Sequence, residues 1–90
     1  MATVKFTSAL NRFFPDLKEL QVEAGNVSDV ITKAEEIYPG IRAYLLEEDG
    51  SLRKHVNIFI DEDLIHDRNK LSDPVRPANE VLIFQALSGG

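Results

Sequence analysis

The residue best suited to chemistry is the last one, Gly90, which follows Gly89 and carries the terminal carboxylate. Glycine has no Cβ, so two glycines can enter a narrow channel and let a partner's reactive groups approach closely. A free carboxylate is a poor acyl donor, because its charge must be lost and its oxygen is a poor leaving group. An acyl-adenylate supplies a good leaving group, and a sulfur nucleophile can then take the carbonyl carbon. We therefore expect Gly90 to be a substrate group for partner proteins.

The remaining residues offer little catalytic equipment. There is no cysteine, which excludes a thiol nucleophile, a disulfide and a thiolate metal site on this chain. His55 and His66 lack metal-ligand spacing, and the acidic run 61–63 is typical of a solvated turn. No glycine-rich phosphate loop is present. The sequence thus predicts a non-enzyme with no catalytic residue, metal or bound cofactor, so that partner enzymes must use the ATP and the sulfur source.

Composition argues against further classes of partner. Ninety residues make one domain, and a formal charge of −5 argues against nucleic acid, which needs a basic surface. No apolar run reaches the ~18 residues of a membrane span, which argues against a membrane partner. The first residues lack the apolar segment of a signal peptide, so we expect a cytoplasmic protein.

The elements that must present the terminal residues follow from hydrophobic periodicity. Alternation predicts strands over residues 2–9 and around Leu20 and Val22, joined as an antiparallel hairpin. Asn26 is a good helix N-cap, and Pro39-Gly40 ends the helix. Between them one apolar stripe is expected to face the core, made of Val27, Val30, Ile31, Ala34, Ile37 and Tyr38.

The second half adds further strands. We expect a helical turn at 41–46 that directs Ile41, Tyr44 and Leu45 to the core, a strand at 55–61, a short edge strand at 64–65 and a last strand at 81–85. Leu71 and Val75 are predicted to insert their side chains into the core. The order predicts an α+β, β-grasp (ubiquitin-like) domain over 1–86, with a flexible tail at 87–90. Its mixed sheet has four to five strands, with the first and last central and parallel, and one main helix packs on one face.

One helix covers only one face of such a sheet. The other face carries Phe59, Leu82 and Phe84, and a contiguous exposed apolar patch is typical of a partner-binding surface. The alternative is that the loops 41–54 or 66–80 lie over this face.

With these elements in order, the chain resembles the MoaD/ThiS family of ubiquitin-like sulfur carriers. The resemblance rests on the strand 56–60, the helix end 38–41 and the block 79–84 that leads to Leu87-Ser88-Gly89-Gly90. The stretch 56–64 is most similar to the CysO-type carriers of cysteine biosynthesis. Family tails often carry proline where this chain has Gln85-Ala86, which leaves the pathway open.

The resemblance implies a role for each of these residues. Gly90 would be adenylated by an E1-like enzyme and converted to a thiocarboxylate that donates sulfide, while Gly89, Ser88 and Leu87 give access to it. Phe59, Leu82 and Phe84 would contact partners. The implied partners are the adenylating enzyme, a sulfurtransferase or desulfurase, and a sulfur-acceptor synthase. The alternatives are the small subunit of molybdopterin synthase, a ubiquitin-like protein modifier, and a plain interaction domain.

Overall fold

A computed structural model describes residues 1–85 of the chain. The predicted tail residues Leu87, Ser88, Gly89 and Gly90, and the predicted domain limit at residue 86, lie outside these described residues. The elements, in chain order, are β1 (Ala2–Phe6), the 3-10 helix η1 (Ser8–Arg12), β2 (Leu20–Val22), α1 (Val27–Ile37), α2 (Ile41–Leu45), β3 (Val56–Ile60), β4 (Asp63–Leu64) and β5 (Glu80–Gln85).

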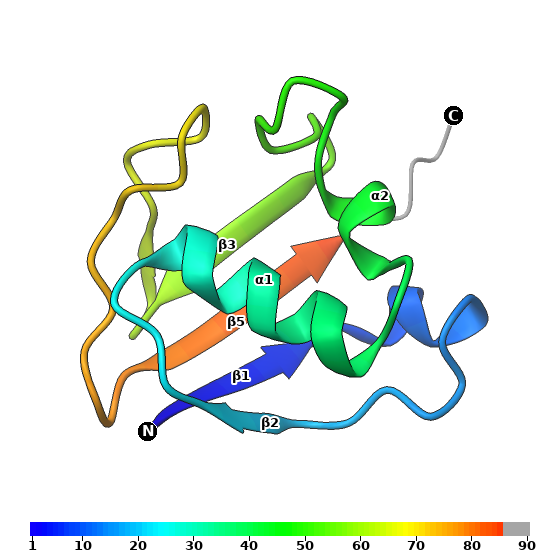
Figure 1. Ribbon diagram of the computed structural model, residues 1–90, viewed down its shortest axis with the longest axis horizontal. Coiled ribbons are helices and arrows are strands. Elements are labelled where there is room, and N and C mark those ends of the chain that lie inside the picture. The colour runs from blue at the N-terminus through cyan, green and yellow to red at the C-terminus, as the bar shows by residue number, and fades with distance from the viewer. Residues whose placement is uncertain (86–90) are drawn as a thin grey trace.

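The strands form one mixed sheet in the order β2-β1-β5-β3-β4 (Figure 1). The last strand, β5, lies at the centre, parallel to β1 and antiparallel to β3. The first two strands form the expected antiparallel hairpin. The predicted β-grasp arrangement, with β1 and β5 parallel and adjacent, is confirmed.

Helix α1 begins and ends as the sequence predicts. The side chain of Asn26 accepts a hydrogen bond from the Asp29 N–H at 2.8 Å, which satisfies a donor of the first turn. Four stripe residues are buried, namely Val27, Val30, Ile31 and Ala34. Ile37 was wrongly placed in the stripe, since it is 51% exposed. Tyr38, which the prediction also placed in the stripe, packs against the core at the end of the helix.

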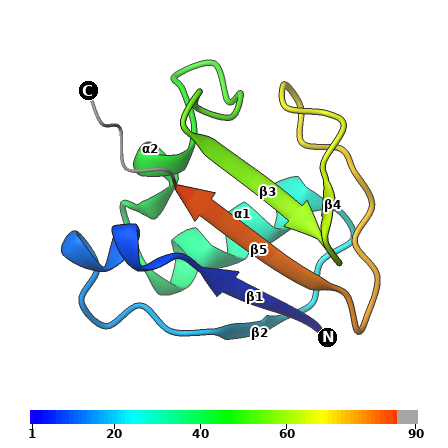
Figure 2. The ribbon, with the colours of Figure 1, turned by 180° about the vertical axis from the view of Figure 1, so that it is seen from behind.

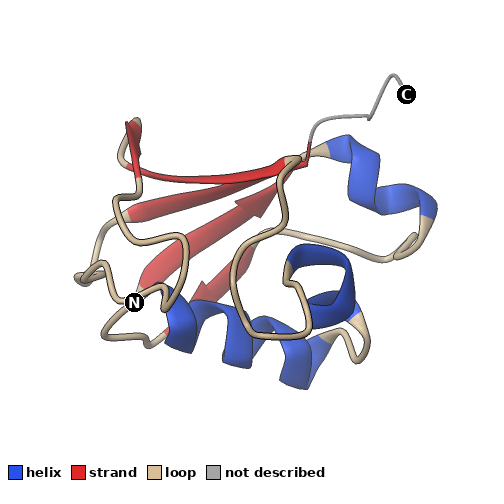
Figure 3. Cartoon of the chain, turned by 90° about the horizontal axis from the view of Figure 1, so that it is seen from above, coloured by secondary structure: helices blue, strands red, loops and turns tan. Residues whose placement is uncertain are grey.

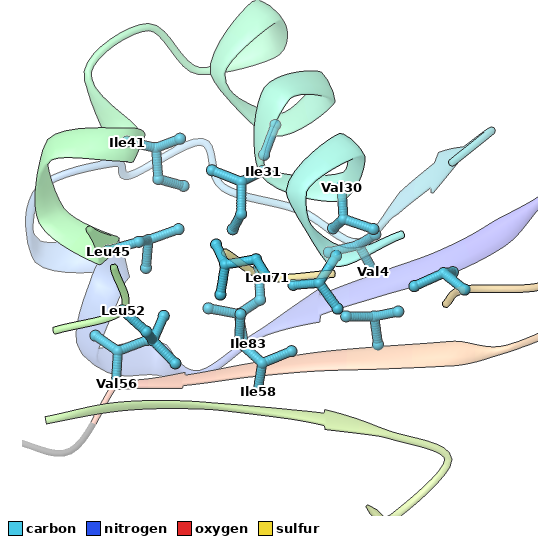
Figure 4. Close-up of a cluster of buried hydrophobic side chains, with 14 of the residues drawn as sticks. Val4, Val30, Ile31, Ile41, Leu45, Leu52, Val56, Ile58, Leu71 and Ile83 are labelled. Atoms are coloured by element: carbon cyan, nitrogen blue, oxygen red, sulfur yellow. The ribbon is translucent and has the colours of Figure 1, made fainter. Parts of the chain in front are cut away.

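The core lies between α1 and the sheet (Figure 4). Val4, Ile58 and Ile83 from the sheet are fully buried, and Ile31 from α1 lies over them. Leu71 is buried as the expected plug, and so are Val75, Ile41 and Leu45. Tyr44 does not enter the core as predicted, because its ring stacks on Phe13 at a centroid distance of 4.6 Å and remains 36% exposed.

The strand boundaries differ from the prediction by one residue at each end of β3 and by one residue at the start of β5. The first strand and the edge strand also differ. The first strand ends at Phe6 rather than residue 9, because the chain turns at Thr7 into η1, which buries Leu10. The edge strand is Asp63–Leu64 instead of 64–65. A tight turn sets this register, with Asp61 (φ 49°) and Glu62 (φ 79°) both left-handed, as two-residue hairpin turns require. Among residues 1–85, no helix is long and apolar enough to span a membrane.

Candidate functional site: the uncovered sheet face and the end of β5

One face of the sheet has no helix across it. Figure 3 shows α1 along one side of the sheet, and Figure 2 shows the strands from the other side with no helix in front of them. Phe59 lies directly opposite Leu82 in the β3–β5 register and opposite Leu64 in the β3–β4 register. Phe84 lies one pair further along β5, opposite Asn57. We call the four apolar residues Phe59, Leu64, Leu82 and Phe84 the open face.

The open face is accessible. Phe84 is 39% exposed and Leu64 is 48% exposed, while Phe59 and Leu82 are half-buried. The sequence correctly grouped Phe59, Leu82 and Phe84 but missed Leu64. Leu64 could have been found from side-chain alternation, because its neighbour Ile65 is buried and adjacent side chains point to opposite faces. The edge strand is Asp63–Leu64, one residue earlier than predicted.

The two long loops do not cover this face. Their apolar residues Leu46, Leu52, Leu71 and Val75 belong to the core cluster instead. In Figure 2 the loops lie beyond the ends and edges of the strands rather than across them. The alternative in which loops 41–54 or 66–80 shield the face is therefore wrong.

Polar groups surround the open face. Lys5 lies beside Leu82 in the β1–β5 register, and its Nζ is 3.4 Å from an Oε of Glu80. The Arg68 guanidinium donates a hydrogen bond to the Asn57 side chain at 3.0 Å. An apolar centre with a polar rim is the usual composition of a protein–protein interface. Both charges of the Lys5–Glu80 pair are exposed, so the pair contributes little to stability and remains available to a partner.

The start of β5 is fixed by a residue that the sequence assigned to a solvated turn. The Asp61 carboxylate accepts the Glu80 N–H at 2.8 Å and a hydrogen bond from the Asn79 side-chain amide. Asn79 in turn accepts the Arg76 N–H at 2.7 Å. Asp61 therefore positions the strand that leads to the terminal residues, a role visible only once the β3–β4 turn and β5 are placed together.

The remaining acidic residues near α1 hold loops together. The Asp67 carboxylate accepts the backbone N–H groups of Lys70, Asn69 and Ser72 and the Ser72 hydroxyl. These bonds, led by the one from Lys70, lower the pKa of Asp67 to about 2. Within the described residues, no group of three or more His, Cys, Asp or Glu side chains could hold a metal ion. The hydrogen bonds of Asp67 therefore serve to organise the loop at residues 67–72.

The other end of β5 opens onto a shallow hollow. Ala43, Tyr44, Arg53 and Gln85 line it, and the Arg53 Nε donates to the Ala43 carbonyl at 3.0 Å. The Oε1 atom of Gln85 is buried and has no hydrogen-bond partner among residues 1–85. Gly90, Gly89, Ser88 and Leu87, the predicted reactive and access residues, follow this point and lie outside the described residues.

Comparisons with known proteins agree with this geometry. The chain matches the model of the ThiS family over residues 4–90. None of the curated protein sequences compared with the chain matches it significantly. A chain of the Amycolatopsis orientalis BexX/CysO complex superimposes with a TM-score of 0.84 at 22% identity, and the match covers 100% of both chains.

Two further solved structures share the fold. Mycobacterium tuberculosis CysO gives a TM-score of 0.82 at 22% identity, covering 97% of this chain and 100% of the other. The small archaeal modifier protein 1 of Methanosarcina acetivorans gives 0.78 at 23% identity, covering 99% of this chain and 95% of the other.

Proposed function

The chain belongs to the ThiS family, and from this premise we propose that it is a sulfur carrier whose C-terminal Gly90 is converted to a thiocarboxylate. The observation that carries the proposal is that the family match extends through Gly89 and Gly90, which follow the strand that bears Leu82 and Phe84 after three further residues. The reactive carboxylate and the partner-binding surface would thus belong to one continuous segment.

The proposed chemistry has two steps. The Gly90 carboxylate attacks the α-phosphate of ATP, which forms an acyl-adenylate and releases pyrophosphate. Sulfide then attacks the acyl carbon, the carbon–oxygen bond to AMP breaks, and AMP leaves with the electron pair. The product is a Gly90 thiocarboxylate that can later donate its sulfur to an acceptor and regenerate the carboxylate with water.

This chain takes no catalytic part in either step. It has no cysteine, and we assign it no residue that activates ATP. An E1-like adenylating enzyme would bind the nucleotide, a sulfurtransferase or desulfurase would supply the sulfur, and a sulfur-acceptor synthase would consume it. We place these reactions in the cytoplasm, where ATP is available.

The open face supports the proposal because a carrier must be held while its terminus reacts. Apolar, partly exposed Phe59, Leu82 and Phe84 give the adenylating enzyme a surface to bind, and the Lys5–Glu80 rim gives orientation. Interactions at this surface would convert an encounter of two proteins into a positioned reaction at Gly90.

The test combines the purified protein with a ThiS-type adenylating enzyme, ATP and sodium sulfide. We expect the intact mass to rise by the difference between sulfur and oxygen, with the change confined to Gly90 in fragment spectra. A variant lacking Gly89 and Gly90 is the control and should gain nothing. Failure of the intact protein to gain sulfur with every adenylating enzyme of its own cell would refute the proposal.

A second candidate, a protein modifier, is favoured by the likeness to the small archaeal modifier protein 1. In that case the activated Gly90 would form an isopeptide bond with a lysine amine, with loss of AMP. Tryptic digests of the cell's proteins would then contain lysines that carry the terminal residues of this chain. Their absence, together with a Gly90 thiocarboxylate, would leave the carrier function alone.

A further inference from the structure

A side chain that follows β1 directly, rather than a backbone group, holds the last described residue of β5. The Gln85 N–H donates a hydrogen bond to Oγ1 of Thr7 at 3.1 Å, across 78 positions of sequence. Thr7 is the first residue after β1, whereas Gln85 ends β5 immediately before the terminal five residues. The contact therefore lies at the last described residue of β5.

The hydroxyl replaces a backbone acceptor that is used elsewhere. The Thr7 N–H donates to the Ile83 carbonyl at 3.1 Å, as the parallel β1–β5 ladder requires. The next bond of such a ladder would join the Gln85 N–H to the Thr7 carbonyl. That carbonyl instead accepts the Leu10 N–H at 3.2 Å, because η1 begins here. The Thr7 hydroxyl makes no capping bond to η1 and is left to receive Gln85.

On the opposite side Gln85 lies beside Val56 of β3 in the strand register. The Val56 N–H donates to the Arg53 carbonyl at 3.1 Å, and the Val56 carbonyl accepts a hydrogen bond from the Arg68 guanidinium at 2.9 Å, so both backbone groups of Val56 are used elsewhere. Thr7 is thus the only described side chain that bonds the Gln85 backbone, and its removal would leave the strand end free on the β1 side.

From this geometry we propose that Thr7 is a positioning residue that fixes the point from which the terminal residues extend. The inference rests on the proposed function of Gly90. Five extended residues span at most about 17 Å. If β5 separated from the sheet at Phe84, two more residues, or about 7 Å of chain, would lie between the last paired residue and Gly90, and Phe84 would leave the open face. The Thr7–Gln85 hydrogen bond, which we call the clamp, would therefore keep the length of chain between the open face and Gly90 constant.

Three variants test the proposal. Thr7→Val keeps the shape and β-branching but removes the acceptor, whereas Thr7→Ser keeps the hydroxyl. Thr3→Val is the matched control, because Thr3 lies in β1, four residues before Thr7, and its hydroxyl bonds only the exposed Gln21 side chain. Two readouts are needed, namely amide hydrogen exchange of Gln85 by NMR and the kcat and KM of Gly90 thiocarboxylate formation.

We expect Thr7→Val to speed Gln85 exchange by roughly fivefold, the effect of losing one ordinary hydrogen bond. It should lower kcat by a similar factor while KM changes by less than about twofold, since most of the open face remains. Thr7→Ser should restore both values, and Thr3→Val should change neither.

Unchanged Gln85 exchange in Thr7→Val would overturn the clamp, whether or not the wild type accepts sulfur. Faster exchange with normal kcat, or with a change in KM alone, would overturn the positioning role. A wild type that never becomes a thiocarboxylate would refute the proposed function, and the exchange experiment would still decide whether the clamp exists.

Discussion

Phe59 and Leu82 lie directly opposite each other across the β3–β5 ladder, on the face that α1 does not cover. The neighbouring pair, Ile58 and Ile83, points into the core and is fully buried. Because side chains alternate along a strand, the register that buries one pair must expose the other. The same strand pairing that builds the core therefore builds the open face, and a slip of one residue would destroy both.

The open face should lose partner affinity without losing its fold when Phe84 is replaced by threonine. Threonine favours strands, so Phe84→Thr removes the ring and keeps the strand preference. We expect the affinity for the adenylating enzyme to fall about tenfold or more, as for an aromatic anchor at an interface. Isothermal titration calorimetry measures this affinity. The control is Ile37→Thr, which removes a side chain that is 51% exposed on α1. Equal losses in the two variants would show that the open face has no special role.

The core should be sensitive at Ile58. Its side chain is fully buried beneath α1 with Ile31 and Ile83, so Ile58→Ala would leave a cavity. We expect the free energy of unfolding to fall by about 2–5 kcal/mol. Urea denaturation followed by circular dichroism measures the change, and Ile37→Ala should lie close to the wild type. A loss at Ile58 no larger than that at Ile37 would contradict this core assignment.

Acid should weaken the loop that holds the start of α1. Asp67 has a pKa of about 2 in the folded protein, below its ordinary value of 3.8, because backbone N–H groups led by that of Lys70 bind its ionised form. A lowered pKa means that the stabilisation is complete above the unfolded value and is lost as the pH falls from about 4 to about 2. The stability difference between the wild type and Asp67→Asn should therefore shrink across this range.

Urea midpoints measured at several values between about pH 6 and pH 2 provide the check on Asp67. Ser72→Ala, which removes the hydroxyl donor, should raise the pKa of Asp67 toward its ordinary value in an NMR titration. A difference between wild type and Asp67→Asn that is constant with pH would exclude this carboxylate as a source of acid sensitivity.

Helix α2 should depend on a carboxylate of α1. The two oxygens of Glu35 accept the N–H groups of Gly40 and Arg42, each at 2.9 Å, and these bonds, led by Gly40, lower the pKa of Glu35. Glu35→Ala should therefore speed amide exchange at Gly40 and Arg42 and lower the melting temperature. Glu36→Ala, a change at the next and more exposed position, is the control. Unchanged exchange at both amides in Glu35→Ala would show that this cap does not hold α2.

Much of the fold could be predicted because local signals and burial agree. Some signals involve only residues that are close in sequence. Examples are Asn26 at the helix start and the alternation of Val81 and Ile83 with Leu82 and Phe84. The parallel pairing of the first and last strands followed from the order of elements. The sequence errors occur where tertiary contacts decide. Ile37 continues the helical period but is exposed, whereas the next residue, Tyr38, packs against the core. Tyr44 stacks on Phe13 and does not enter the core.

The contacts that position the candidate site could not be predicted from the sequence. Asp61 reaches Glu80 across 19 positions, and Thr7 reaches Gln85 across 78. Neither residue carries a local signal for these bonds, because each serves as a hydrogen-bond acceptor only after distant strands have paired. Acidic turns and strand-ending threonines are ordinary in sequence, and their partners here depend on the β-grasp arrangement.

The proposed carrier function requires that Gly90 occurs as a thiocarboxylate in the cell that makes this protein. The most direct measurement is intact and fragment mass analysis of the protein isolated from that cell after treatment with iodoacetamide, which alkylates a thiocarboxylate. We expect a fraction of the molecules to carry sulfur and the alkyl group at Gly90, and this fraction should disappear when the adenylating enzyme is deleted. Only free carboxylate at Gly90, or only isopeptide bonds to lysines of other proteins, would contradict the proposed carrier function.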